Sequence, residues 1–180
     1  MGDEYYVVEE GLGSRTTDLD YDRKPGRNGK SYLVPCLGSH TPIDIVVLML
    51  GTNDLKTEYS RTSGDIAIAI NGLVDDVRKF AQDRIGNAPR VILISPIEIN
   101  SDASRFVEFY TGYYDERAML ESHKLAEAIS ELAQKTGCEF LDAAAVSKPG
   151  EDGIHFSEES EAPLAAALEP LIKKLVTASK

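Results

Sequence analysis

The chain has 180 residues, a length that suits one ordinary domain, and we expect residues 1–180 to form a single domain. Hydrophobic residues make up 42% of it and charged residues 27%, which excludes a disordered or collagen-like chain. The net charge of −11, from 30 acidic and 19 basic residues, argues against binding to nucleic acid or to anionic membranes. Neither a secretory signal nor a membrane-spanning run is visible, so a cytoplasmic location is expected.

In chain order, apolar runs and helical periodicity alternate. Residues 5–10 are aromatic and β-branched, and residues 44–50 are almost entirely apolar, which is typical of strands. Apolar residues at helical spacing follow, bounded by capping residues and by glycine or proline. The expected elements are a strand at 5–10, a short helix at 31–40, a strand at 44–50, a helix at 65–84, a strand at 90–95, a helix at 115–135, a strand at 138–142 and a final helix at 158–176.

This alternation predicts an α/β domain with a parallel sheet. Right-handed crossovers place the functional loops of such a domain at the carboxyl ends of its strands. The loops at 11–17, 51–56, 96–114 and 143–155 should therefore meet around one crevice.

Asp152 and His155 form the first candidate constellation. Three residues apart in a loop before the final helix, they allow the carboxylate to orient the imidazole, and a histidine held in this way can act as a general base. The alternative is a surface aspartate beside a helix-capping histidine. His40, in a connector, and His123, in the middle of a predicted helix, are weaker candidates.

Two further loops have residue types that suit an oxyanion site. Asn53 directly follows the strand at 44–50, where its amide could donate to a developing oxyanion, although the same residues also suit an ordinary turn. The small residues at 11–14 follow the first predicted strand and would let backbone N–H groups approach a ligand closely, although such loops are common.

The cysteines do not indicate a metal centre. Cys36 and Cys138 are about a hundred residues apart, without metal-ligand spacing, so we expect a pair of buried thiols and no structural zinc site. Neither a metal nor an organic cofactor is expected.

Taken together, the motifs resemble the SGNH (GDSL-like) hydrolase family, in particular its bacterial arylesterase and acyltransferase-like branch. The order and spacing agree from about residue 5 to about residue 176. The stretches that match are Glu9–Leu12, Arg15–Thr17, Arg27–Gly29, Tyr32–Leu33, Pro42–Val46, Met49–Lys56 and Asp152–Phe156. The resemblance implies a flavodoxin-like three-layer α/β/α sandwich with a parallel sheet.

The resemblance also implies a chemistry, hydrolysis or transfer of short acyl groups by a Ser-His-Asp mechanism. His155 would be the general base and Asp152 its orienting partner. Asn53 and the backbone N–H of Ser14 would form the oxyanion hole, and Gly51 would be the turn that sets Asn53. The expected partner is a small-molecule ester substrate, and a homo-oligomer is expected by analogy.

The sequence departs from the family at its start. The family opens with a strand that ends in a Gly-Asp-Ser block, whose serine is the nucleophile, whereas Met1-Gly2-Asp3-Glu4 contains no serine. The nucleophile is therefore unknown, and by this resemblance we expect the first central strand of the order 2-1-3-4-5 to be missing. We expect an N-terminally truncated esterase whose activity is impaired. Ser14 lies near the expected crevice and is a weak candidate for a replacement nucleophile.

Two rival interpretations remain open. The chain could be a non-catalytic relative that binds an acyl or sugar ligand, or an acidic scaffold whose aromatic stretch at 106–114 docks a partner. The joint presence of Asn53, Asp152 and His155 favours an enzyme, because a binding protein has no need of all three.

Overall fold

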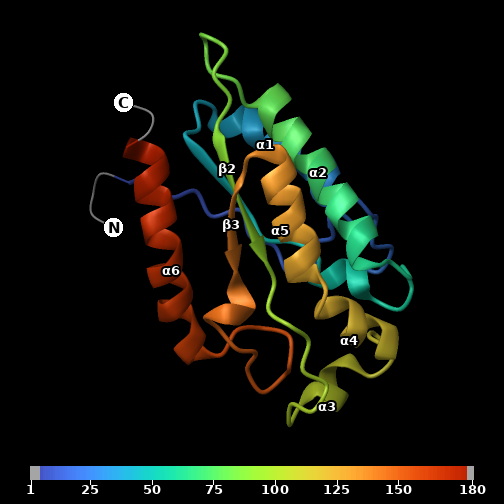
Figure 1. Cartoon of the computed structure of the whole chain (residues 1–180). Coiled ribbons are helices and arrows are strands. Elements are labelled where there is room, and N and C mark those ends of the chain that lie inside the picture. The colour runs from blue at the N-terminus through green and yellow to red at the C-terminus, as the bar shows by residue number, and fades with distance from the viewer. Residues whose placement is uncertain (1–4, 178–180) are drawn as a thin grey trace.

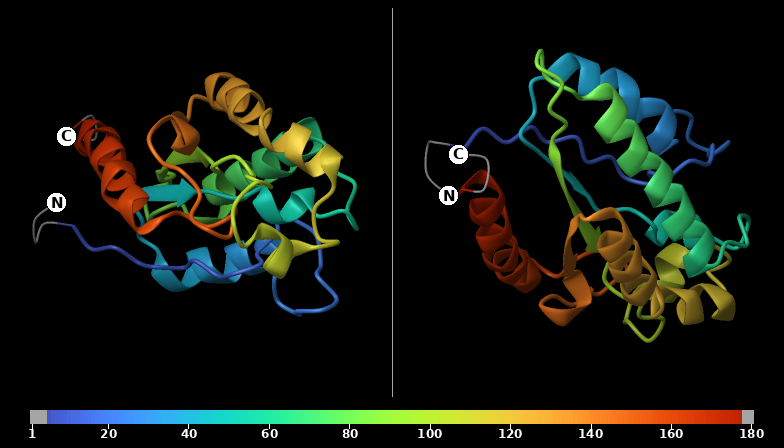
Figure 2. Two further views of the ribbon diagram at one scale, coloured as in Figure 1. Left: turned by 90° about the horizontal axis from the view of Figure 1, so that it is seen from below. Right: turned by 45° about the horizontal axis from the view of Figure 1, so that its top comes forward.

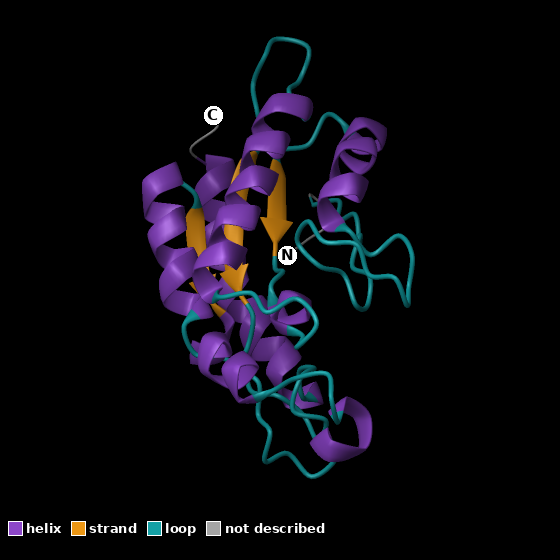
Figure 3. Ribbon diagram, turned by 90° about the vertical axis from the view of Figure 1, so that its right-hand side faces the viewer, coloured by secondary structure: helices purple, strands orange, loops and turns teal. Residues whose placement is uncertain are grey.

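Three parallel strands form one sheet, in the order β1-β2-β3, within residues 5–177, the part of the chain that the computed structural model describes (Figure 1). The strands are β1 (Ile45–Leu48), β2 (Arg90–Ser95) and β3 (Glu139–Asp142). In register, Leu48 lies opposite Leu93, and Leu93 lies opposite Phe140. The strands point the same way, so the loops that follow them gather at one end of the molecule (Figure 3).

Helices connect and cover the strands. Across residues 5–177, no helix is both long and apolar enough to cross a bilayer. The helices are α1 (Gly29–His40), α2 (Ser63–Phe80), α3 (Phe106–Tyr110), α4 (Glu116–Ser122), α5 (Leu125–Thr136) and α6 (Glu158–Thr177), with short 3-10 turns at η1 (Thr52–Leu55) and η2 (Ala143–Ala145).

The alternation of side chains along β2 divides the core into two parts. Val91 and Leu93 belong to the cluster formed with α2 and α5, whereas Ile92 and Ile94 belong to the cluster against α6. Successive residues of a strand point to opposite faces, so β2 has apolar side chains in both clusters. Figure 2 shows α6 on one side of the strands and α2 and α5 on the other. The predicted α/β architecture with helices on both faces is confirmed.

Local capping explains where α2 begins. The Thr62 hydroxyl accepts a hydrogen bond from the Asp65 N–H, and the Asp65 carboxylate accepts one from the Thr62 N–H. This reciprocal box makes Thr62 the cap, so the helix begins at Ser63, two residues before the predicted start.

The predicted strand at 5–10 is wrong. These residues form no strand, and Tyr6 and Val7 are 93% and 65% exposed. The side chain of Glu10 instead contacts α1, where its Oε1 lies 2.8 Å from Nε2 of His40. A strand needs a neighbour for its backbone hydrogen bonds, and none lies beside this segment within the described part of the chain.

The single helix predicted at 115–135 is also wrong, because it is two helices, α4 and α5. The Ser122 hydroxyl donates to the carbonyl oxygen of Met119 at 2.7 Å and accepts from the Ile99 N–H at 3.2 Å. It competes with the N–H of His123, which is 3.4 Å from the same carbonyl. The chain changes direction there, and α5 begins at Leu125.

Candidate active site

Asp152 and His155 are in direct contact in the loop before α6. Nδ1 of His155 lies 2.6 Å from Oδ2 of Asp152. Oδ1 of Asp152 accepts the backbone N–H groups of Ile154 and His155, each at 2.9 Å. The loop therefore holds the carboxylate by its backbone and leaves the second oxygen for the imidazole. The His155 side chain is 74% exposed, so its other nitrogen can be reached from outside.

Gly153 allows this tight turn. Its φ is +77°, and an added Cβ would lie 2.1 Å from the carbonyl oxygen of Asn100. The Asn100 N–H donates to the Gly153 carbonyl at 2.9 Å, and the Arg105 N–H donates to that of Glu151 at 2.9 Å. The loop is thus fixed against the segment that follows β2, at a distance that only glycine permits.

The surroundings of Asp152 favour its charged form. Partial burial raises the pKa of this carboxyl, but hydrogen bonds from the Ile154 N–H, the His155 side chain and the His155 N–H more than offset it, and the pKa lies below its ordinary value. An ionised carboxylate can only accept hydrogen bonds, so the proton of the contact lies on Nδ1 of His155. Nε2 is then the basic nitrogen of the pair.

Tyr110, at the end of α3, also contacts this pair. Its hydroxyl lies 3.3 Å from Oδ2 of Asp152 and 3.4 Å from Nδ1 of His155. Burial, together with the charge of Asp152, raises the pKa of Tyr110 to about 12, so at neutral pH the phenol is a donor. Sequence reasoning did not assign this residue; the only signal was the aromatic run at 106–114.

Gly51 and Asn53 follow β1 in η1. Gly51 has a φ of +130°, and an added Cβ would lie 3.1 Å from Cγ2 of Ile66, so the turn requires glycine. Its carbonyl accepts the Asp54 N–H at 3.0 Å, which closes the turn. Asn53 is half-buried, and within residues 5–177 its side-chain amide makes no hydrogen bond. The amide is therefore available to a ligand.

Ser14 lies in the loop after the N-terminal segment with a φ of +68°, a conformation that favours glycine. Its hydroxyl accepts a hydrogen bond from Nζ of Lys24 at 3.3 Å. Its backbone N–H has no acceptor in the described part of the chain, which leaves a donor there.

A buried hydrogen-bond network joins the Ser14 loop to η1. Asp54 is fully buried, and its two carboxylate oxygens accept the Thr17 N–H at 3.1 and 3.0 Å. Arg61 lies 3.2 Å from the same carboxylate and 2.6 Å from Asp18. Burial raises the pKa of Asp54, although the Thr17 bonds and Arg61 act in the opposite direction. Sequence reasoning regarded Asp54 only as a turn residue.

The structure brings some of the predicted site residues together and leaves others apart. Asp152 and His155 touch, but no hydrogen bond within residues 5–177 links either one to Asn53 or Ser14. Other hydrogen bonds join the loops indirectly. The Thr17 N–H donates to Asp54, which links the Ser14 loop to η1. The Thr57 N–H donates to the Tyr113 carbonyl at 2.9 Å, which links the segment after η1 to the segment after α3. All four residues lie on loops anchored near the carboxyl end of the sheet.

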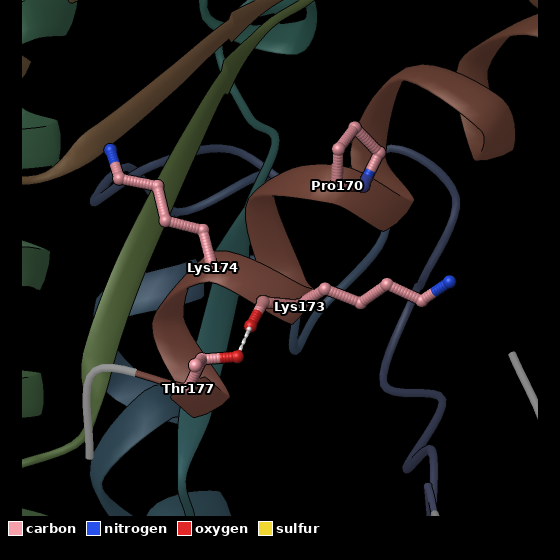
Figure 4. A pocket seen from close by; sticks show the side chains of 4 residues that line it. All are labelled: Pro170, Lys173, Lys174 and Thr177. Carbon is pink, nitrogen blue, oxygen red and sulfur yellow. Dashed lines mark hydrogen bonds between the residues drawn. The ribbon is translucent and has the colours of Figure 1, made fainter. Parts of the chain in front are cut away.

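A surface hollow lies elsewhere, along α6, and is lined by Pro170, Lys173, Lys174 and Thr177 (Figure 4). Pro170 is 12 residues beyond the start of α6, roughly 18 Å along the helix from the end that follows His155. This hollow therefore does not belong to the Asp152–His155 site.

Comparison with known proteins identifies relatives over most of the chain. The GDSL-like lipase/acylhydrolase family model matches residues 1–162. An inhibitor-bound aryl esterase of M. smegmatis is 37% identical, with a TM-score of 0.87 over 97% of this chain and 80% of that chain. A carbohydrate acetylesterase from Sinorhizobium meliloti is 34% identical, with a TM-score of 0.87 and the same two coverages of 97% and 80%. No curated protein matches.

A more distant neighbour, an acetyl-xylooligosaccharide esterase from Geobacillus, is 18% identical with a TM-score of 0.59, and it shows the fold alone. The match covers 90% of this chain and 69% of the Geobacillus chain. The family match and the two structures described first, each more than 30% identical to this chain, agree with the α/β fold. On this evidence the chain belongs to the GDSL-like lipase/acylhydrolase family, the SGNH hydrolases.

Proposed function

We propose that this protein acts on short-chain carboxylic esters as an SGNH-type serine esterase or acyltransferase, with a Ser-His-Asp mechanism. The observation that carries the proposal is the Asp152–His155 pair, in which the carboxylate binds Nδ1 at 2.6 Å and the imidazole remains 74% exposed. A general base and the carboxylate that orients it are two of the three members of a catalytic triad.

In this mechanism Nε2 of His155 removes the proton from a serine hydroxyl as that oxygen attacks the ester carbonyl carbon. Asp152 keeps the imidazole in the required tautomer and stabilises the imidazolium that forms. When the tetrahedral intermediate collapses, His155 returns the proton to the alcohol that leaves. Water, or a second alcohol, then attacks the acyl-enzyme by the same steps in reverse.

The oxyanion of the tetrahedral intermediate needs donors that are free in the resting protein. The Asn53 amide and the backbone N–H of Ser14 meet this condition within the described residues. Donors that are already oriented stabilise the developing charge without reorganisation, and one such donor contributes about 3–4 kcal/mol. The two loops that supply them are held together by the buried Thr17–Asp54 bonds.

The nucleophile is the remaining part of the proposal. The Ser14 hydroxyl accepts a hydrogen bond from Lys24, and among the residues that the structure describes it forms none with His155. Within residues 5–177, β1 pairs only with β2, and Val47 and Met49 on and after this edge strand are 41% and 39% exposed. We assign the nucleophilic serine to a further strand that pairs with the open side of β1 and ends beside the Ser14 loop and Asn53.

The proposed substrate class rests on the activities of the aryl esterase and the carbohydrate acetylesterase described above. Both act on esters, and the second acts on acetyl esters, so the proposed substrate is a small-molecule ester with an acetyl-sized acyl group.

The test is hydrolysis of p-nitrophenyl acetate by three proteins: the 180-residue chain, the chain preceded by a strand that ends in Gly-Asp-Ser, and the same extension ending in Gly-Asp-Ala. We expect turnover only with the serine-ending extension, and we expect His155→Ala in that protein to reduce it by orders of magnitude. The alanine-ending extension controls for restored folding without a nucleophile.

Two outcomes would contradict the proposal. Turnover by the 180-residue chain that disappears with His155→Ala would place the nucleophile within this sequence, and Ser14→Ala would then test the alternative. Equal rates for the serine and alanine extensions, both insensitive to His155→Ala, would instead favour a ligand-binding relative without catalysis.

A further inference from the structure

A second cluster of reactive side chains lies on α1, away from Asp152 and His155. Tyr32, Cys36 and His40 are spaced by four residues, so they share one face of the helix. Glu10, from the segment that does not form a strand, lies against this face. Its Oε1 is 2.8 Å from Nε2 of His40, and its Oε2 accepts a hydrogen bond from the Tyr32 hydroxyl.

The ligand atoms of Glu10, Cys36 and His40 all lie within 4.8 Å of one another. Ligands at about 2.0–2.3 Å from a tetrahedral zinc ion are separated by roughly 3.3–3.8 Å. Small side-chain rotations that open the Glu10–His40 contact and draw in the thiol would satisfy this geometry. We propose that Glu10, Cys36 and His40 form a Zn²⁺ site with water in the fourth position.

The chemistry of the donors selects the metal. A thiolate, an imidazole and a carboxylate suit Zn²⁺, whereas Mg²⁺ and Ca²⁺ prefer oxygen ligands alone. Glu10 and the Cys36 thiolate supply two negative charges against the two positive charges of the ion. The thiol gives up its proton to solvent when it binds, and His40 coordinates as the neutral imidazole.

The surroundings already hold the Glu10 ligand in place. Nη1 of Arg15 donates to the backbone carbonyl of Glu10 at 2.9 Å, and the Arg15 guanidinium lies 4.1 Å from the centre of the Tyr32 ring. Tyr32 bonds the carboxylate oxygen that does not face His40. Partners of this kind orient a ligand from outside the coordination sphere.

The proposed site would fasten residues 5–10 to α1. The spacing of Cys36, Cys138 and the nearby histidines in the sequence does not predict this site. The third ligand, Glu10, comes from 26 residues before Cys36 and reaches it only because the segment runs along α1. The site does not depend on the proposed esterase activity.

Titration of the 180-residue chain with Co²⁺ as a spectroscopic probe, followed by displacement with Zn²⁺, tests the proposal. We expect one equivalent of Co²⁺ to give tetrahedral visible bands and a near-ultraviolet thiolate charge-transfer band, and Zn²⁺ to abolish both. Cys36→Ser should remove the charge-transfer band, and His40→Ala and Glu10→Gln should each weaken Zn²⁺ binding by about tenfold or more. Cys138→Ser and His123→Ala are the matched controls and should bind like the parent.

Circular dichroism of each variant establishes that it is folded. The absence of a thiolate charge-transfer band in the parent chain would overturn the proposal, and so would a band that persists in Cys36→Ser. Equal losses in the Cys36 and Cys138 variants would also overturn it, because they would indicate binding by exposed thiols in general.

Discussion

The hydroxyl of Tyr110 donates to Oδ2 of Asp152 at 3.3 Å, and the same oxygen accepts the Nδ1 proton of His155 at 2.6 Å. One carboxylate oxygen therefore binds both a phenol and an imidazole. The phenol stabilises the charge on Asp152 and restricts where the carboxylate can turn. Its ring is fixed by contact with the rings of Phe106 and Tyr114, at centroid separations of 5.7 and 5.8 Å.

Removing this hydroxyl should slow the proposed reaction without weakening substrate binding. Tyr110→Phe keeps the ring and deletes one hydrogen bond, whose net contribution is about 0.5–1.5 kcal/mol. We expect kcat to fall roughly 2- to 10-fold, with KM little changed, when p-nitrophenyl acetate hydrolysis is measured in the serine-bearing extended protein. Tyr113→Phe is the control, because that residue lies in the same aromatic cluster and does not bond Asp152. Equal effects of the two variants would show that Tyr110 acts through packing alone.

Replacing Asn53 should lower kcat more than removing the Tyr110 hydroxyl does. If its amide stabilises the oxyanion, Asn53→Ala should lower kcat by about 100- to 1000-fold while leaving the far-ultraviolet circular dichroism spectrum unchanged. Asn71→Ala is the matched control, because its amide bonds Asp75 on the exposed surface of α2. A loss below threefold in the Asn53 variant, in the same extended protein, would remove this residue from the oxyanion hole.

The effect of Gly153→Ala on stability tests the geometry of the loop that holds Asp152 and His155, independently of catalysis. Gly153→Ala must adopt a positive φ and also place a Cβ 2.1 Å from a backbone oxygen. Gly86→Ala has a φ of +89° but open space around it, so it isolates the conformational cost of about 1–2 kcal/mol. We expect Gly153→Ala to lower the free energy of unfolding by more than about 3 kcal/mol in urea titrations. Similar losses in both variants would mean that the loop yields easily.

The charge on Asp152 should make part of the stability dependent on pH. Because the folded-state pKa lies below its ordinary value, the ionised carboxylate stabilises the fold above the unfolded pKa of about 3.9. That contribution is lost as the pH falls through the folded-state value. Asp152→Asn should therefore lower the free energy of unfolding at pH 7, and the difference from the parent should disappear in stronger acid. A difference that stays constant from neutral to acid pH would contradict this assignment.

Much of the architecture was predictable from local patterns. The strands predicted at 44–50, 90–95 and 138–142 became β1, β2 and β3. Only β2 is buried along almost its whole length, as its continuous apolar residues predict, whereas β1 and β3 are partly exposed. The Asp152–Gly153–Ile154–His155 spacing was sufficient to suggest a carboxylate–imidazole pair, since such a turn is closed by its own backbone.

Contacts between distant segments decided the rest. The β-forming composition of residues 5–10 did not produce a strand, because a strand depends on its neighbour. One predicted helix became two at Ser122, whose hydroxyl accepts the Ile99 N–H and donates to the Met119 carbonyl.

The sequence by itself determined the three strands of the sheet, helices α1, α2 and α6, the family motifs and the turn that joins Asp152 to His155, since these depend on residues close together in the chain. Only the tertiary structure placed Tyr110 against that pair, from 42 residues away, and Glu10 beside Cys36 and His40. Such contacts leave no periodic signal, because they depend on how separate elements pack and not on the spacing of residues within any one of them.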